Sequence, residues 1–458
     1  MKKLTINSLI ILSIIYAVSC SKDFLDDKPL SNLVVPSTIK EFTAILDNEL
    51  LNVTNALTQI SADEIYIPNQ DDYLSLPTLT ERNAYVWNKD IYEGATRIPD
   101  WNLLYQSIYY ANSILAELQK NSLKSTTAGQ NIEGWARFIR AHAFYDLAIT
   151  FALAYDSSTA HITKGIPIRL TPNIDELAPR SNLKETYDQI IEDFKVAAKL
   201  LINEIPPPQI NRPSKAAAFG ALARVYLSMN KYTDAEVYAD SSLGLYDKLI
   251  DYNSVNQTSN TPFTGINEEI LFSANQIVAY SRLTSSSTTS VYSCDSNLLK
   301  SYDDNDLRKI LYFRNSNGKF IMKRRYGKAT LYPFTGLATD EIFLIKAECA
   351  ARRNDTNVAL FYLNRLLINR YKTGEFIPIE SGSATEVLGR ILEERKKELV
   401  FRGVRWADIK RLNATDPTIV LTRNIGSENY QILPNSPRYA LPIPDDEIIW
   451  SGIEQNER

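Results

Sequence analysis

The chain has 458 residues, of which 44% are hydrophobic and 23% are charged, a composition typical of a globular protein with a sizeable core. Its net charge of −4 argues against a nucleic-acid-binding protein, which usually carries a basic surplus on one face. With two histidines the chain is short of the commonest general base and metal ligand, whereas its 26 tyrosines suit polar recognition surfaces.

The N-terminus predicts an export signal that ends at a lipidated cysteine. Two lysines precede an apolar stretch from Leu9 to Val18, which is shorter than the ~20 residues of a membrane span. Small residues then lead to Cys20, as in a lipobox. We therefore expect residues 1–19 to be a lipoprotein signal peptide and residues 20–37 to comprise the lipidated cysteine and a polar tether. An ordinary secretory signal with an incidental cysteine is the alternative.

Residues 38–458 are expected to form a single, mainly α-helical domain. Apolar residues recur at helical spacing in residues 101–118 and 183–201, and residues 134–155 are apolar around most of the helix. Three consecutive prolines from Pro206 stop the chain after the last of these helices.

Two later segments carry the alanine spacing of tetratricopeptide repeats. Ala235 follows Ala223 by 12 residues, and Ala359 follows Ala347 at the same distance. Small residues at these positions let two antiparallel helices approach closely. Such helix pairs stack because neither pair can bury its apolar face alone. We therefore expect the pairs to form a superhelical scaffold.

Irregular segments interrupt the helical pattern. The tetratricopeptide-like pairs are expected within about 101–250 and 337–412. Residues 63–100 and 251–335 are instead rich in Ser, Thr, Asn, Asp and aromatic residues without a helical period. Because long loops inside a compact domain are often functional, we expect these segments to form the ligand surface, with minor β structure.

The sequence contains no motif of a known active site. It lacks the Gly-rich loops of nucleotide-binding proteins, the HExxH motif of zinc proteases and the GxSxG motif of serine hydrolases. His142 lies in an apolar helical pattern and is expected in the core. Asp303, Asp304 and Asp306 resemble a calcium loop only weakly, because the EF-hand glycine and terminal glutamate are missing. We predict no catalysis, no cofactor and no metal site.

The stretch EERKKELVFRGVRWADIKRL, residues 393–412, is densely charged. On a helix, Glu393 and Lys397 are four residues apart, as are Glu398 and Arg402, so both pairs are expected to form supporting ion pairs. We interpret the stretch as a structural signature and not as a ligand site.

The same stretch predicts a helix break. Gly403 is expected to adopt a positive φ, with Arg405 and Asp408 hydrogen-bonded across the break. Leu392, Leu399 and Trp406 are expected to face the core.

Several motifs in chain order resemble those of the SusD-like (RagB/SusD) family of outer-membrane nutrient-binding lipoproteins. The charged stretch, with its Gly-x-Arg-Trp-x-Asp ending, resembles the most recognisable of them. The others are SADEIY at 61–66, YVWNKDIYEG at 85–94, WNLLYQSIYYAN at 101–112, GWARFIRAHAFYDLA at 134–148, DEIFLIKAECAAR at 340–352 and ALPIPDDEI at 440–448.

The resemblance implies a lipoprotein of the outer membrane that faces the cell exterior and is anchored through Cys20. Such a protein captures oligosaccharides and delivers them to a SusC-like TonB-dependent transporter, without catalysis, cofactor or nucleic-acid partner. Three alternatives stay open: an oligopeptide-binding partner of a RagA-like transporter, a surface glycoside hydrolase, and a structural lid with little affinity of its own.

Sugar rings present apolar faces between hydroxyl groups, which aromatic and amide or carboxylate side chains recognise respectively. For Trp87 a buried position is favoured over a ligand contact. The candidate ligand-binding residues are Tyr66, Tyr73, Tyr85, Trp87, Tyr280, Tyr292 and Tyr326, with Asn69, Asp71 and Asp72 as polar partners.

Overall fold

A computed structural model describes residues 36–323, 326–327 and 330–458. Within it, Ile39–Arg458 forms one compact unit that holds every element described below. The expected signal peptide, Cys20 and nearly all of the expected tether lie outside the described residues. Among the helices of the described ranges, none combines the length and the apolarity needed to cross a membrane.

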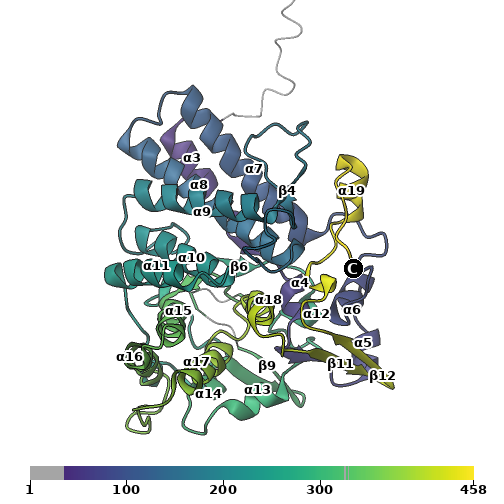
Figure 1. The fold of residues 1–458 in the computed structure, drawn as a ribbon, viewed down its shortest axis with the longest axis vertical. Coiled ribbons are helices and arrows are strands. Elements are labelled where there is room, and N and C mark those ends of the chain that lie inside the picture. Colours follow the sequence, from purple (N-terminus) through teal and green to yellow (C-terminus); the bar gives the residue numbers. More distant parts are fainter. Residues whose placement is uncertain (1–35, 324–325, 328–329) are drawn as a thin grey trace, which may run out of the picture. The chain divides into compact units, whose positions relative to one another are not determined.

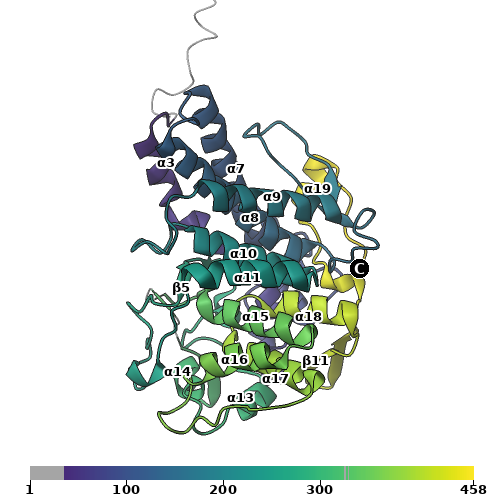
Figure 2. The same ribbon diagram turned by 60° about the vertical axis from the view of Figure 1, so that its left-hand side comes forward.

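The fold is mainly α-helical, as the helical periodicity predicts. Seven long helices follow one another along the chain in contact, and Figure 2 shows α9, α10, α11, α15 and α16 as successive layers. The long helices are α7 (Pro99–Lys120), α8 (Thr127–Phe151), α9 (Leu183–Leu200), α10 (Lys215–Ser228), α11 (Tyr232–Leu245), α15 (Thr339–Arg352) and α16 (Thr356–Leu367).

Side-chain caps fix where several of these helices begin. The Thr126 hydroxyl accepts the Gly129 N–H, which starts α8 before the expected apolar run. Asn182 and Glu185 form a capping box at the start of α9. Each such cap gives a hydrogen-bond acceptor to a backbone N–H that has none within the helix, which stabilises the helix by about 1 kcal/mol.

The alanine spacing correctly predicts two close helix pairs. Ala223, Ala235, Ala347 and Ala359 are all fully buried, in α10, α11, α15 and α16 respectively. A Cβ atom at Gly220 of α10 would lie within about 3.3 Å of side-chain atoms of both α11 and α15. The three helices therefore pack too closely for a larger residue at this position.

Short elements fill the segments expected to be loops. Many of their residues are buried, because these segments cover the inner face of the helical layers. The other α-helices of the described residues are α3 (Ile39–Leu46), α4 (Leu57–Ser61), α5 (Gln70–Leu74), α6 (Leu79–Tyr85), α12 (Ser281–Thr284), α13 (Ser296–Ser301), α14 (Arg308–Tyr312), α17 (Ala384–Glu398), α18 (Arg405–Thr415) and α19 (Asp445–Ser451).

The β structure is minor, as expected, and consists of two-stranded pairs. β1 and β6 are parallel, and the other five pairs are antiparallel. The pairs are β1 (Val53–Thr54) with β6 (Asn275–Gln276), β2 (Ile65–Tyr66) with β7 (Ser293–Cys294), β3 (Lys164–Pro167) with β4 (Arg180–Asn182), β5 (Ile270–Phe272) with β10 (Leu337–Ala338), β8 (Phe313–Ser316) with β9 (Lys319–Met322), and β11 (Leu421–Ile425) with β12 (Glu428–Ile432).

The charged helix α17 points much of its charge into the protein. Arg308 is fully buried and contacts three carboxylates, those of Asp306 at 2.7 Å, Glu394 at 2.6 Å and Glu398 at 3.0 Å. Arg370, also fully buried, contacts Glu398 at 2.9 Å. The stretch is therefore structural, because its charges are neutralised inside the molecule.

The ion pairs expected along this helix are wrong. Glu398 binds Arg308 and Arg370, which come from other elements, and Arg402 instead binds Asp340 at 2.9 Å. Arg402 follows the end of α17 and so does not continue its helical spacing. Helical spacing alone therefore could not identify the partners.

The expected pair of Glu393 with Lys397 is also wrong. Glu393 is exposed on α17, whereas Lys397 is buried and contacts Glu394 at 2.9 Å and Asp306 at 3.3 Å. Burial places the lysine ammonium among carboxylates of the interior, away from the exposed face.

The helix break at Gly403 is confirmed, with φ of +72°. Trp406 is buried, as expected. Arg405 does not bind Asp408, however. Its guanidinium donates to Asp63 at 2.7 and 2.9 Å, while Asp408 binds two arginines on its other side.

Candidate ligand-binding surface

The exposed members of the predicted site gather around the short helix α5. We call this surface the α5 patch and define it by Tyr66, Asn69, Asp72, Tyr73, Lys319 and Phe320. Tyr66 is exposed at the end of β2, and Tyr73 is half-buried on α5. Figure 1 shows α5 and α6 beside the β11–β12 hairpin.

Asn69 starts α5 and links it to its own first turn. Its amide oxygen accepts the Asp72 N–H at 2.8 Å, and its amide nitrogen donates to the Asp72 carboxylate at 2.9 Å. Asp71 is exposed. These interactions fix the polar edge of the α5 patch without occupying all of its hydrogen-bonding groups.

Two residues of strand β9 complete the α5 patch. Lys319 contacts the Asp72 carboxylate at 2.9 Å. The Phe320 N–H donates to the hydroxyl of Ser293, the residue paired with Tyr66 across β2 and β7. Phe320 is 42% exposed and Tyr66 is 36% exposed, so both aromatic side chains reach the surface.

A layer of buried aromatic residues supports the α5 patch. The ring centroids of Tyr73 and Tyr85 are 6.2 Å apart. The Arg423 guanidinium lies 4.6 Å from the Tyr85 ring centroid and 5.0 Å from that of Trp87. Arg423 belongs to β11, so this stack joins the hairpin to the segment that carries the α5 patch.

Burial corrects four predicted ligand contacts, and for Trp87 it is the position that the sequence favoured. Tyr85, Trp87, Tyr292 and Tyr326 are each at most 1% exposed, so their rings cannot meet a ligand in this structure. Their polar groups have partners inside the protein: the Trp87 indole donates to Ser61 O at 2.9 Å, for example.

Tyr280 is half-buried at the start of α12, in the left-handed region with φ of +53°. Burial and then the neighbouring Asp100 carboxylate raise the pKa of its hydroxyl well above the usual range. Its ring packs against the core, and its hydroxyl lies beside the buried Asp100 carboxylate. The polar end of Tyr280 therefore lies in the interior and not with the exposed candidates.

Sequence reasoning missed Lys319 and Phe320 because it treated residues 251–335 as loop. A signal was present. Asn317-Gly318 is a dipeptide typical of tight hairpin turns, and both residues have positive φ, +53° and +81°. The alternation of exposed Phe320 with buried Ile321 also indicates a strand.

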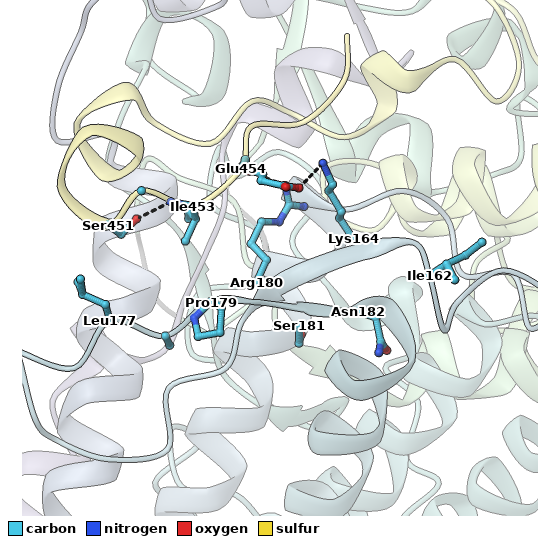
Figure 3. A pocket seen from close by; sticks show the side chains of 12 residues that line it. Ile162, Lys164, Leu177, Pro179, Arg180, Ser181, Asn182, Ser451, Ile453 and Glu454 are labelled. Carbon is cyan, nitrogen blue, oxygen red and sulfur yellow. Dashed lines mark hydrogen bonds and ion pairs between the residues drawn. The ribbon is translucent and has the colours of Figure 1, made fainter.

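Several surface cavities border the C-terminal segment and not the α5 patch. One of about 480 Å³ lies between β4 and the chain after α19. Figure 3 shows that Lys164 and Glu454 close its rim, with their charged atoms 2.6 Å apart. The Arg180 guanidinium donates hydrogen bonds to the carbonyl oxygens of Gly165 and Glu454. The basic side chains of this cavity therefore make contacts within the protein.

The structure gives no support for chemistry at the histidines or acidic residues. Among the described residues, no group of three or more His, Cys, Asp or Glu side chains is arranged to hold a metal ion. His142 is in the core, as expected, and burial lowers its pKa to about 3, so it is neutral at physiological pH. Asp306 binds Arg308 and is not a cation ligand.

Comparisons with known proteins agree with this fold. A family model described as "Starch-binding associating with outer membrane" matches residues 23–227, and the SusD family model matches residues 280–456. Over 380 residues the chain is 24% identical to SusD-like protein P2 of Formosa agariphila, covering 69% of this chain and 71% of that one.

Solved structures of the same superfamily share the fold. A SusD superfamily protein of Bacteroides thetaiotaomicron has a TM-score of 0.74 at 21% identity, with 92% of this chain and 100% of that chain covered. Surface glycan-binding protein A of Bacteroides fluxus has a TM-score of 0.68 at 16% identity, covering 92% and 99%. Members of this family are non-catalytic carbohydrate-binding proteins. With both family models matched in order along its length, the chain belongs to the SusD-like family.

Proposed function

We propose that the protein is a surface lipoprotein that captures oligosaccharides and passes them to a SusC-like TonB-dependent transporter. Family membership supports binding without catalysis. The names of two structural neighbours, a putative sugar-binding protein of Bacteroides vulgatus and surface glycan-binding protein A of Bacteroides fluxus, point to the same class of ligand.

The observation that carries the proposal is the composition of the α5 patch. It combines two exposed aromatic rings, Tyr66 and Phe320, with the charged pair of Asp72 and Lys319. Aromatic faces cover the apolar faces of sugar rings, and the polar groups between them can exchange hydrogen bonds with hydroxyls. The ammonium and carboxylate neutralise each other, which suits an uncharged glycan.

The buried layer below supports this role. Because Tyr85, Arg423 and Trp87 are fixed in the interior, Tyr73 and its neighbours are held in place before a ligand arrives. A preorganised surface loses less side-chain entropy on binding, so more of the contact energy becomes affinity.

Anchoring and delivery are the further parts of the proposal. Cys20 would carry the lipid that holds the protein on the outer membrane, and the SusC-like transporter would receive the captured glycan. A family model that describes its members as associated with the outer membrane supports this location.

Calorimetry of the protein against neutral polysaccharides, their oligosaccharides and mixed peptides tests the proposal. We expect heat of binding with at least one glycan and an unchanged glycan after prolonged incubation. Binding of peptides in its place would support the oligopeptide alternative. Shortened glycan products would support a hydrolase, and no binding to any glycan or peptide would support a lid.

A further inference from the structure

A second, smaller cleft lies on helix α7, away from the α5 patch. It has a volume of about 250 Å³ and is bordered by the first turns of α7, by the chain after β3 and by Glu447 of α19. It shares no residue with the α5 patch. Its volume is below the roughly 300 Å³ of pockets for drug-sized ligands, so it suits a single small ring.

The floor of the cleft is aromatic. Trp101 and Tyr105 are one helical turn apart and lie on the same side of α7, with ring centroids 4.8 Å apart. Trp101 is buried and Tyr105 is half-buried, so the Tyr105 ring is the one that a ligand can meet. Both have their polar atoms fixed: the Trp101 indole N–H donates to Glu447 at 3.3 Å, and the Tyr105 hydroxyl donates to Pro167 O at 2.8 Å. The floor is therefore rigid.

The walls carry polar groups that the fold leaves available. Asn102 and Gln106, again one turn apart on α7, are exposed, and Arg169 faces the cleft from the opposite side. Within the described ranges, the side chains of these three residues have no hydrogen-bond or ion-pair partner. One carboxylate oxygen of Glu447 accepts the hydrogen bond from the Trp101 indole, and the other is available to a ligand.

The charged groups at the α7 cleft limit the class of ligand that it can bind. Glu447 and Arg169 both act on the Tyr105 hydroxyl: after burial, the carboxylate raises its pKa and the guanidinium lowers it. One acidic and one basic group at the same cleft give no net charge. A phosphate, sulfate or carboxylate would meet Glu447 unfavourably, whereas a neutral polyol can donate to Glu447 and accept from Arg169.

We propose that the α7 cleft is a second carbohydrate site, which binds one neutral pyranose ring against the half-buried ring of Tyr105. Amide, guanidinium and carboxylate groups around this ring match the hydroxyls of the sugar, and the tyrosine matches its apolar face. A second site on the same molecule would raise the avidity for a long glycan already held at the α5 patch.

The indole N–H of Trp101 reports on this cleft directly. Full-length protein with ¹⁵N-labelled tryptophan, purified in detergent, would give one indole NMR signal for each of its five tryptophans. The Trp101→Phe variant assigns the signal. The probes are the methyl glycosides of glucose, galactose, mannose and xylose, each titrated alone.

We expect at least one glycoside to shift the Trp101 signal in a saturable way. Arg169→Ala and Gln106→Ala should each weaken this response about tenfold, the loss of one or two good hydrogen bonds. Gln119→Ala is the matched control, since it makes the same change at an exposed position farther along α7. It should respond like the wild type.

The Tyr66→Ala/Phe320→Ala variant separates this inference from the proposed function. If the α7 cleft is an independent site, this variant keeps the Trp101 response even though its α5 patch is disabled. Failure of all four glycosides to move the signal, or a full response in both Arg169→Ala and Gln106→Ala, would overturn the proposal.

Discussion

Asp63 and Glu64 are consecutive in the chain, and the fold shifts the pKa values of their carboxyl groups in opposite directions. Burial would raise the pKa of Asp63, but the positive charges of Arg405 and Lys396 outweigh it and hold that pKa well below its usual range. For Glu64, burial raises the pKa to about 7, although one oxygen accepts the Phe401 N–H at 2.9 Å. Position in the fold, not residue type, decides the charge of each group.

Glu64→Gln should remove a pH dependence of stability. Because the folded pKa of Glu64 is raised above 4.5, the contribution of its protonated form is complete below about pH 4.5 and is lost as the pH rises through about 7. Glutamine keeps the acceptor for Phe401 but cannot ionise. We expect the variant to match the wild type near pH 4.5 and to exceed it in free energy of unfolding near pH 8, by urea denaturation.

The exposed substitution Glu393→Gln is the control and should leave the wild-type pH profile unchanged. A Glu64→Gln variant with the same decline between these pH values as the wild type would show that Glu64 is already ionised in the folded protein.

Asp408→Asn should have the opposite pH signature. Burial would raise the pKa of Asp408, but the guanidinium groups of Arg395 and Arg411 outweigh it and lower the pKa to about 2. The stabilisation is therefore present above about pH 4 and is lost as the pH falls toward about 2. Asparagine leaves two buried arginines without this carboxylate, so we expect a loss of about 3–5 kcal/mol near neutral pH.

Urea unfolding at several pH values measures both effects, with the exposed Asp416→Asn as the matched control. Equal stability of Asp408→Asn and wild type near neutral pH would mean that the arginines find other partners.

At the scale of the element, the turn between α17 and α18 shows how distant segments fix a strained backbone. Phe401, a residue with a side chain, has φ of +60°, and Gly403 has φ of +72°. The Glu64 carboxyl holds the Phe401 N–H, and the Phe401 ring packs against Tyr292 and Phe313 with centroids 6.1 Å away. Side chains from other elements thus offset the backbone cost of a positive φ.

Gly403→Ala tests this turn. A Cβ atom there would lie 3.2 Å from a methyl group of Thr335, and the left-handed backbone disfavours alanine. We expect the free energy of unfolding to fall by about 1–2 kcal/mol. Gly389→Ala is the matched control, because Gly389 is exposed in the middle of α17 with open space around it. That change should raise stability by up to about 1 kcal/mol, and the same gain at Gly403 would contradict the strain.

The elements also show what a single sequence can and cannot predict. The long helices follow from local spacing of apolar residues, and the alanines of α10 and α15 predict close packing because both signals lie within one or two elements. The partners of α17 do not follow from spacing. Arg308 and Arg370 reach Glu398 from segments 90 and 28 residues away along the chain, and only the tertiary fold brings them there.

At the scale of the whole molecule, the candidate site was only partly predictable. The segment from Tyr66 to Tyr73 reaches the surface except at the buried Ile67, but an aromatic residue in an irregular segment can equally point inward, as Tyr292 and Tyr326 do. Phe320 is linked to Tyr66 through the pairing of β2 with β7 and through the hydrogen bond from the Phe320 N–H to the Ser293 hydroxyl on β7. That long-range pairing has no counterpart in local sequence pattern.

If the α5 patch binds glycan, removal of its exposed aromatic rings should weaken binding, and calorimetry of three proteins with one glycan tests this. The glycan identified by the binding panel is titrated into the wild type, into Tyr66→Ala/Phe320→Ala and into Phe361→Ala, which removes an exposed ring from α16. We predict that the double variant binds at least about tenfold more weakly while Phe361→Ala binds like the wild type. Equal affinity of all three proteins would contradict a glycan site at the α5 patch.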